Sequence, residues 1–173
     1  TYPRGIYAET ARFMSARALY LDTPDPRLDQ SSTIKAIGEI QVFTEYYPYS
    51  KYRQQANAML YELHDRLVEK EYRSAKLYYD LGNYMGNNYQ ACIITAQNAL
   101  NDYPYTKLRE DLSILILRAR YGMAKESVQE KMMDRYRDTE DEYYAFKNEF
   151  PESKYMKEAD RIYRETLKAL KNK

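Results

Sequence analysis

The sequence predicts an all-α fold in which helical repeats stack one after another, and three observations lead to that prediction. Four prolines each follow an aromatic residue, in the pairs Tyr2-Pro3, Tyr47-Pro48, Tyr103-Pro104 and Phe150-Pro151. The prolines are 45, 56 and 47 residues apart, a spacing typical of repeats built from two helices. Apolar or aromatic residues recur four, eight and eleven positions after each proline, and those offsets lie on one face of a helix.

Each aromatic-proline pair predicts an elbow between two helices. Proline cannot continue the preceding helix, and it moves the residue before it out of the α conformation. Two positions after the proline, Ser50, Thr106 and Ser153 offer a hydroxyl that can cap the next helix. We therefore expect one repeat domain over residues 1–173, with repeats at about 1–47, 48–103 and 104–150 and a terminal helix at about 151–173.

The first repeat is predicted to contain two helices, at about residues 4–21 and 33–46, joined by a loop at 22–32 that contains Pro24 and Pro26. The inward stripe of the first helix is expected to be Tyr7, Ala11, Met14 and Ala18. In the second helix, the residues at helical spacing are Ile37, Ile40 and Phe43.

The segment from Lys51 to about Met85 contains no helix breaker before Gly82. Its apolar stripe consists of Tyr52, Ala56, Met59, Leu60, Leu63, Leu67, Ala75, Tyr78 and Met85. The stripe lapses at Lys70-Glu71, so either one very long helix or a bend at that point fits the pattern. The following Gly86-Asn87-Asn88 is predicted to be a turn, because Gly and Asn tolerate positive φ after a helix.

The remaining helices are predicted at about residues 89–102, from 106 to between 122 and 127, and at 130–148 and 153–170. Core positions in the first two are Cys92, Ile93, Ala96, Ala99, Leu100, Leu112, Leu115, Ile116 and Ala119. In the third, Thr139 and Glu142 have the spacing of a capping box, which predicts a break near Asp138.

The last predicted helix has two different faces. The apolar face consists of Tyr155, Ala159, Ile162, Tyr163, Thr166 and Leu170. The opposite face is basic and consists of Lys157, Arg161, Arg164, Lys168 and Lys171. Two interpretations stay open: the solvated outer face of a helix that caps the array, with cations favoured near its C-terminus, or a contact strip for an acidic partner.

Composition and chemistry exclude several function classes. With 27 basic and 26 acidic side chains, long-range attraction to nucleic acid or anionic lipid is not expected. The longest apolar run, residues 112–117, is interrupted by Ser113 and is too short to span a bilayer. His64 is the only histidine and Cys92 the only cysteine, and no phosphate-binding or nucleophile motif occurs. We therefore predict no enzymatic activity, no metal and no cofactor.

Residues 74–104, SAKLYYDLGNYMGNNYQACIITAQNALNDYP, resemble a tetratricopeptide repeat. The resemblance depends on Leu81-Gly82, on Tyr89 at the entry to the second helix, and on Ala99-Leu100 shortly before Pro104. It implies helix pairs stacked as a right-handed superhelix, an α-solenoid whose extended concave surface binds polypeptides.

The repeated elbow, the extended helix after Lys51, the segment KEYRSAKLYY and the ending LNDYP make nearly the whole chain similar to the BamD family. These are tetratricopeptide lipoproteins of the bacterial outer-membrane β-barrel assembly machinery. The resemblance begins after the family's first two repeats and weakens beyond Ala119. It implies that the lipidated cysteine would precede Thr1, so membrane contact is expected only through an N-terminal lipid anchor absent from this chain.

The resemblance further implies a non-catalytic scaffold on the periplasmic face of the outer membrane. It would dock onto the POTRA domains of the barrel-forming subunit, BamA, and onto other subunits of the machinery. A general tetratricopeptide adaptor, or a module of an envelope polysaccharide or division complex, stays open as an alternative. By pattern, the expected partner-binding residues are Tyr84, Tyr89 and Arg120 near the repeat turns and Arg161 and Arg164 on the last helix.

Overall fold

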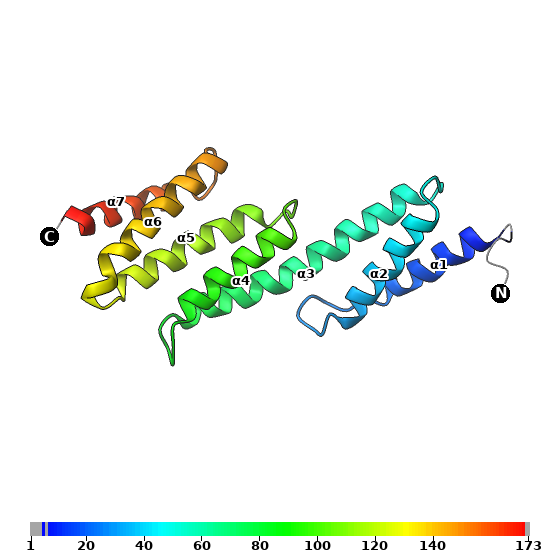
Figure 1. The fold of residues 1–173 in the computed structure, drawn as a ribbon, viewed down its shortest axis with the longest axis horizontal. Coiled ribbons are helices and arrows are strands. Elements are labelled where there is room, and N and C mark those ends of the chain that lie inside the picture. Colours follow the sequence, from blue (N-terminus) through cyan, green and yellow to red (C-terminus); the bar gives the residue numbers. More distant parts are fainter. Residues whose placement is uncertain (1–4, 6, 172–173) are drawn as a thin grey trace. The chain divides into compact units, whose positions relative to one another are not determined.

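The computed structural model describes Gly5 and residues 7–171, and this part of the chain contains seven α-helices and no strand (Figure 1). The helices are α1 (Ala8–Leu21), α2 (Ser31–Tyr46), α3 (Arg53–Leu81), α4 (Asn88–Asp102), α5 (Arg109–Lys125), α6 (Gln129–Glu149) and α7 (Met156–Lys171). The predicted all-α repeat fold is confirmed. The Tyr2-Pro3 elbow and the predicted helix start at Arg4 lie outside the described residues.

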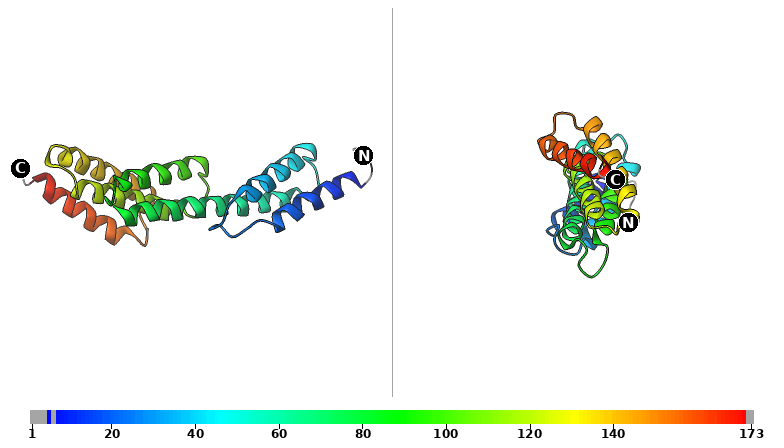
Figure 2. Two further views of the ribbon diagram at one scale, coloured as in Figure 1. Left: turned by 90° about the horizontal axis from the view of Figure 1, so that it is seen from below. Right: turned by 90° about the vertical axis from the view of Figure 1, so that its left-hand side faces the viewer.

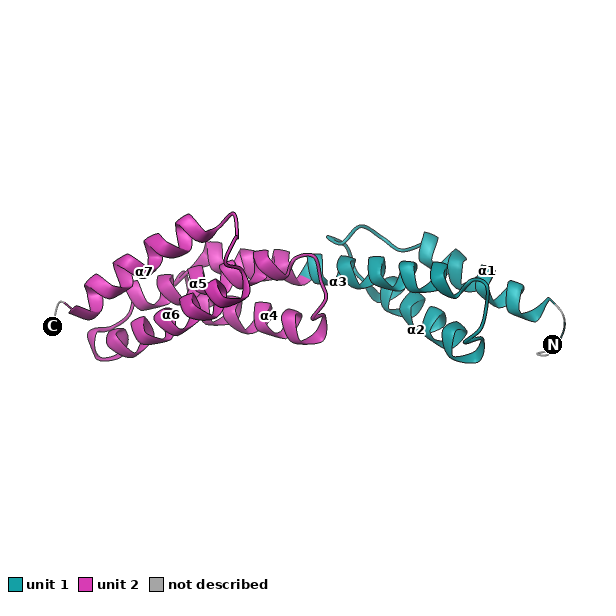
Figure 3. Ribbon diagram, turned by 90° about the horizontal axis from the view of Figure 1, so that it is seen from above, with its two compact units in different colours: residues 1–70 teal, residues 71–173 magenta. Residues whose placement is uncertain are grey.

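The chain divides into two compact units, residues 1–70 and residues 71–173, which Figure 3 shows in different colours. Residues 53–81 form one helix, α3, which is the first of the two alternatives that the sequence pattern left open. The apolar stripe lapses at the unit boundary, because no residue of α3 between Val68 and Ala75 is buried. The single repeat domain expected from the sequence stays a prediction.

In unit 1, α1 and α2 lie beside the first part of α3 (Figures 1 and 2). The Phe13 ring stacks on the Tyr52 ring with their centroids 4.3 Å apart. The predicted inward positions of the second helix are confirmed. The buried core consists of Phe13, Ala16, Ala36, Ile37, Ile40, Phe43, Ala56, Met59 and Leu63.

The predicted inward stripe of the first helix is wrong. Tyr7 is 76% exposed and Met14 46% exposed, and Ala11 and Ala18 are exposed as well. Helix α1 instead buries the adjoining face, which carries Phe13 and Ala16. In α3 and α7, the residues eight and eleven positions after the proline pack against the preceding helices. In α1, no described element covers the face at these same positions.

In unit 2, α5 lies between α4 and the α6–α7 pair and is buried around most of its circumference. The core positions predicted for α4 and α5 are buried, except Leu100, which is half-buried. A second core joins α5 to the last two helices through Ile114, Leu117, Tyr143, Phe146, Ala159 and Ile162.

Helix α6 runs without interruption from Gln129 to Glu149, so the predicted break near Asp138 is wrong. Thr139 is buried, and its hydroxyl donates a 2.8 Å hydrogen bond to the Arg135 carbonyl one turn earlier. The hydroxyl is therefore satisfied inside the helix and caps nothing.

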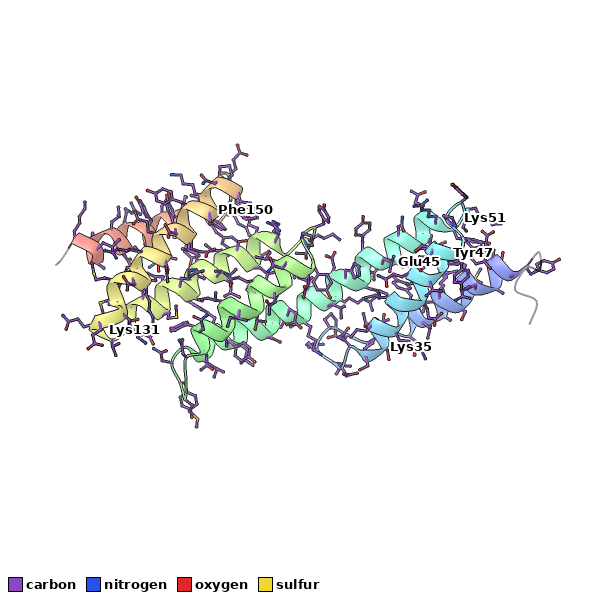
Figure 4. The ribbon with its side chains drawn as sticks, in the orientation of Figure 1. Lys35, Glu45, Tyr47, Lys51, Lys131 and Phe150 are labelled. Atoms are coloured by element: carbon purple, nitrogen blue, oxygen red, sulfur yellow. The ribbon has the colours of Figure 1, made fainter. Side chains whose placement is uncertain are left out.

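The three described elbows share one backbone conformation. The aromatic residue before the proline has φ and ψ of −126° and 64° at Tyr47, −131° and 66° at Tyr103, and −129° and 61° at Phe150. Figure 4 labels Tyr47 and Phe150 at these helix ends. The hydroxyls of Ser50, Thr106 and Ser153 each accept the backbone N–H two residues on, at 3.0, 3.2 and 2.9 Å, in the turn before the next helix. The predicted N-cap role is wrong for Thr106, because the N-cap of α5 is Leu108, which makes no side-chain cap hydrogen bond. Each following helix begins one residue after that N–H.

Candidate protein-docking surfaces

The turn between α3 and α4 spans residues 82–87 and starts four residues earlier than the sequence predicts. Gly82 takes φ +54° and ends α3, and its N–H donates to the Tyr78 carbonyl at 3.2 Å. This left-handed residue after the last helical turn is a common helix C-cap, and glycine adopts it without strain. Gly86 also has positive φ, as the sequence predicts for that turn.

Tyr84 and Met85 form the tip of this turn, and they are 70% and 91% exposed. Met85 has φ +54°, which is uncommon for a residue with a side chain. The Asn88 side chain donates to the Tyr84 carbonyl at 2.8 Å, and the Asn83 side chain donates to Glu126 Oε2 at 2.8 Å. The tip therefore presents an aromatic and a thioether side chain on a hydrogen-bonded turn.

Tyr89, at the start of α4, lies inside the repeat packing behind this turn. Its ring fills the space beside two glycines, since a Cβ at Gly122 would lie 2.8 Å from the ring and one at Gly82 3.0 Å from the hydroxyl. The hydroxyl donates to Glu126 Oε1 at 3.0 Å. Burial, followed by that hydrogen bond, raises the pKa of Tyr89 to about 12.

Arg120 joins α5 to α6 through an ion pair. Its Nε donates to Glu142 Oε2 at 2.7 Å, and its Nη1 lies 4.0 Å from Asp138 Oδ2. Both Arg120 and Glu142 are mostly buried. Burial raises the pKa of Glu142, and the neighbouring guanidinium opposes that rise. Arg120 therefore has a structural partner in this structure.

Arg161 and Arg164 are exposed on α7, as are the other three residues of the predicted basic face. Arg161 makes a 3.5 Å ion pair with Glu165 on its own helix. The apolar face is turned inward: Ala159, Ile162 and Thr166 are buried, and Tyr155, Tyr163 and Leu170 are half-buried. The two-faced helix predicted from the sequence is confirmed.

Sequence reasoning missed two of the most exposed aromatic side chains. Tyr49 is 97% exposed and Tyr105 is 91% exposed, and each directly follows an elbow proline. Behind each elbow an arginine side chain donates to the proline carbonyl, from Arg53 to Pro48 at 2.7 Å and from Arg109 to Pro104 at 3.2 Å. The signal that could have found the tyrosines is their position at the corner of a turn, where a side chain projects outward.

Within Gly5 and residues 7–171, no group of three or more His, Cys, Asp and Glu side chains is placed to hold a metal ion. His64 is half-buried on α3, and burial lowers its pKa. Cys92 is buried in α4, and burial raises the pKa of its thiol to about 12, so the thiol is protonated at neutral pH. None of the described helices combines the length and the apolar character needed to cross a bilayer.

Elbows of one conformation that alternate with paired helices define a helical-repeat protein of the tetratricopeptide type. Residues 1–133 match the model of the YfiO family, which is described as outer membrane lipoprotein, and the chain belongs to this family. The match confirms the resemblance to BamD-like lipoproteins. It ends within α6, so all of α7 lies beyond it. No curated protein matches the chain.

Proposed function

We propose that this protein is a non-catalytic scaffold of the outer-membrane β-barrel assembly machinery, and that it docks from the periplasmic side onto the POTRA domains of the barrel-forming subunit. The observation that carries the proposal is the match of residues 1–133 to a family of outer membrane lipoproteins. The fold supports it, because stacked helix pairs present extended surfaces suited to binding polypeptides.

Tyr84 and Met85 are the proposed apolar anchor of this contact. Exposed aromatic side chains supply large contact areas and are enriched among the residues that dominate binding energy. Arg161 and Arg164 are the proposed cationic contacts. We propose that Tyr89 and Arg120 contribute to partner binding by holding the surface in place. Tyr89 packs under the 82–87 turn, and Arg120 joins α5 to α6 through its hydrogen bond to Glu142.

The direct test is isothermal titration of the chain with purified POTRA domains of the barrel-forming subunit from the same source. The proposal expects saturable binding by at least one POTRA domain. Tyr84→Ala should weaken that binding about tenfold, because it removes an exposed anchor without touching the core. Its matched control is Tyr49→Ala, which removes a still more exposed tyrosine from unit 1.

Absence of heat and of co-elution with every POTRA domain would contradict the proposal. Equal loss of binding in Tyr84→Ala and Tyr49→Ala would retain docking but remove the 82–87 turn as its anchor. Circular dichroism melts of both variants should match the parent chain, since neither tyrosine is packed in a core.

A further inference from the structure

The exposed cations of α7 form a regular strip along one face of the helix. The strip consists of Lys157, Arg161, Arg164, Lys168 and Lys171, at alternating steps of four and three residues. At a rise of 1.5 Å per residue, it extends over about 21 Å. The strip lies on the side of the helix opposite the buried Ala159, Ile162 and Thr166, so it faces the solvent.

The carboxylates of α7 accept hydrogen bonds from α5 and α6. Glu158 accepts two hydrogen bonds from Arg118, at 2.9 and 2.6 Å, and Asp160 accepts the Tyr143 hydroxyl at 2.8 Å. Glu165 accepts the Tyr121 hydroxyl. Hydrogen bonds to α5 and α6 therefore engage all three of these carboxylates, and of the three only Glu165 also pairs with a cation of the strip.

The strip is largely uncompensated. Arg161 pairs with Glu165, whereas the other four cations make no ion pair with any residue that the structure describes. The chain as a whole has a net charge of only +1, so this is a local concentration of charge and not a general basicity. Five like charges on one face repel each other, and an opposite charge laid along them relieves that repulsion.

From this geometry we infer that the α7 strip is a docking surface for an acidic helix of a partner protein, with carboxylates at the same alternating steps. The proposed docking onto POTRA domains uses only Arg161 and Arg164 of this strip, whereas the inference concerns all five cations and the kind of structure that they bind. Helix α7 lies outside the part of the chain that matches the family. Steps of four and three residues keep side chains on one face of a helix, so an acidic helix lying side by side with α7 can match each cation in turn.

Other occupants fit less well. Insertion into a membrane surface needs an exposed apolar face, and the apolar face of α7 is covered by α5 and α6. The strip contains no aromatic side chain on which nucleic-acid bases could stack. A second copy could offer the exposed acids of α6, but Asp134 already pairs with Arg137 at 3.2 Å and Asp138 lies 4.0 Å from Arg120.

The test uses an alanine-rich helical peptide of about 20 residues with five glutamates along one face at the steps of the strip. A control peptide has the same composition with its glutamates distributed around the helix. Binding to the full chain is measured by fluorescence anisotropy at low and physiological salt. We expect the one-faced peptide to bind at least about tenfold more tightly than the control, with both affinities falling as salt rises.

The double variant Arg161→Glu/Arg164→Glu should lose at least about tenfold in affinity for the one-faced peptide. Its control, Lys131→Glu/Arg137→Glu, makes the same charge change at exposed positions on α6 and should bind like the parent chain; Figure 4 labels Lys131 near the start of that helix. Both variants should melt like the parent chain by circular dichroism.

Four outcomes would overturn the inference. Equal affinity for the two peptides, or equal loss in the two double variants, would mean that the strip attracts charge without recognising a helix. Binding to phosphatidylglycerol vesicles that Arg161→Glu/Arg164→Glu abolishes, without peptide binding, would assign the strip to a lipid surface. Self-association by light scattering that the same variant abolishes would assign it to a second copy.

Discussion

The helix α1 of unit 1 and the helix α5 of unit 2 stand at equivalent places in the repeat pattern but are covered differently. The Ser50 hydroxyl donates to Glu9 at 2.5 Å, and the Ser153 hydroxyl donates to Glu110. Glu9 and Glu110 each come six residues after an elbow proline. The same contact therefore links α1 to the next elbow in unit 1 and α5 to the next elbow in unit 2.

Burial separates the two helices at neighbouring offsets. Ten residues after the proline, Phe13 and Ile114 are both buried. Eleven residues after it, Leu115 is buried, whereas Met14 is largely exposed. At the first offset, Phe13 and Ile114 belong to cores shared with the helices that follow in the same unit. At the second offset, the equivalent Met59 of α3 and Ile162 of α7 belong to cores shared with the helices that precede them. The comparison shows that the sequence pattern marks a contact face, while a neighbouring element decides whether that face is buried.

The largest expected effect is the loss of stability when a core residue of α1 or of α5 is truncated. Phe13→Ala should cost about 3–5 kcal/mol of unfolding free energy and Ile114→Ala about 2–5 kcal/mol, because each leaves a cavity in the core of its unit. Urea unfolding followed by circular dichroism measures both. A loss below about 1 kcal/mol at either site would contradict the equivalence of the two cores.

The next prediction separates the helices. Leu115→Ala should cost about 2–5 kcal/mol, since its side chain is enclosed between helices. Met14→Ala, at the same offset in α1, should change the unfolding free energy by no more than about 0.5 kcal/mol. The same urea titration compares the pair. Similar losses at both positions would show that α1 is covered on this face.

One substitution should change stability in opposite directions in two helices. Gly122→Ala in α5 places a Cβ 2.8 Å from the Tyr89 ring and should cost about 1–3 kcal/mol. Gly38→Ala in α2 meets nothing within 4 Å and should add up to about 1 kcal/mol, because alanine is the better helix former. Thermal melts give both signs, and destabilisation by Gly38→Ala would be inconsistent with the packing described.

The elbow serines should behave alike in the two units. Ser50→Ala and Ser153→Ala each remove the hydrogen bond from the N–H two residues on and a hydrogen bond to the equivalent glutamate, so each should cost about 0.5–2 kcal/mol. Urea titrations of the two variants, with Ser→Thr at each position as the conservative control, measure these costs. Costs that differ by more than about 1 kcal/mol would argue against equivalent elbows.

The smallest effect concerns pH. The hydrogen bonds from Arg118 hold the pKa of Glu158 below its ordinary value. A depressed carboxyl pKa stabilises the folded state above the unfolded pKa, and that contribution disappears as pH falls through the lower folded pKa. Glu158→Gln should therefore be less stable than the parent chain near neutral pH, and the gap should close in acid. A gap that widens in acid would refute this assignment.

In unit 1 the position equivalent to Glu158, seven residues after the proline, is Gln55. Gln55→Ala is therefore the matched control for the pH experiment. Its effect on the unfolding free energy should not vary with pH, since a glutamine side chain does not titrate.

Much of the fold was predictable, because aromatic-proline elbows and helical periodicity are local signals. The elbows at Tyr47, Tyr103 and Phe150 were predicted from neighbouring residues alone. The buried face of α1 was not predictable in this way. Met14 would be buried only if another helix packed against it, and the spacing of residues does not show whether such a helix is present. The α6 break was wrong for a related reason: a mid-helix threonine can satisfy its hydroxyl within the helix, as Thr139 does.

The residues of the candidate surfaces were predictable only where the side chain is not packed in the core or paired with a distant residue. The α7 cations follow from their spacing, and Tyr84 follows from its place in a turn. Tyr89 and Arg120 were chosen by the same criteria, yet they are occupied by packing and by an ion pair with residues distant in sequence. Their roles in partner binding stay predictions.

The position eleven residues after the proline is exposed to solvent in α1 and buried in α5. Cysteine labelling tests this difference most directly. Met14→Cys and Leu115→Cys would each be made with Cys92→Ser, which removes the native buried thiol. Reaction with a maleimide under native conditions should be fast at position 14 and at least about a hundredfold slower at position 115, where opening must precede labelling. Equal rates at the two positions would contradict the account.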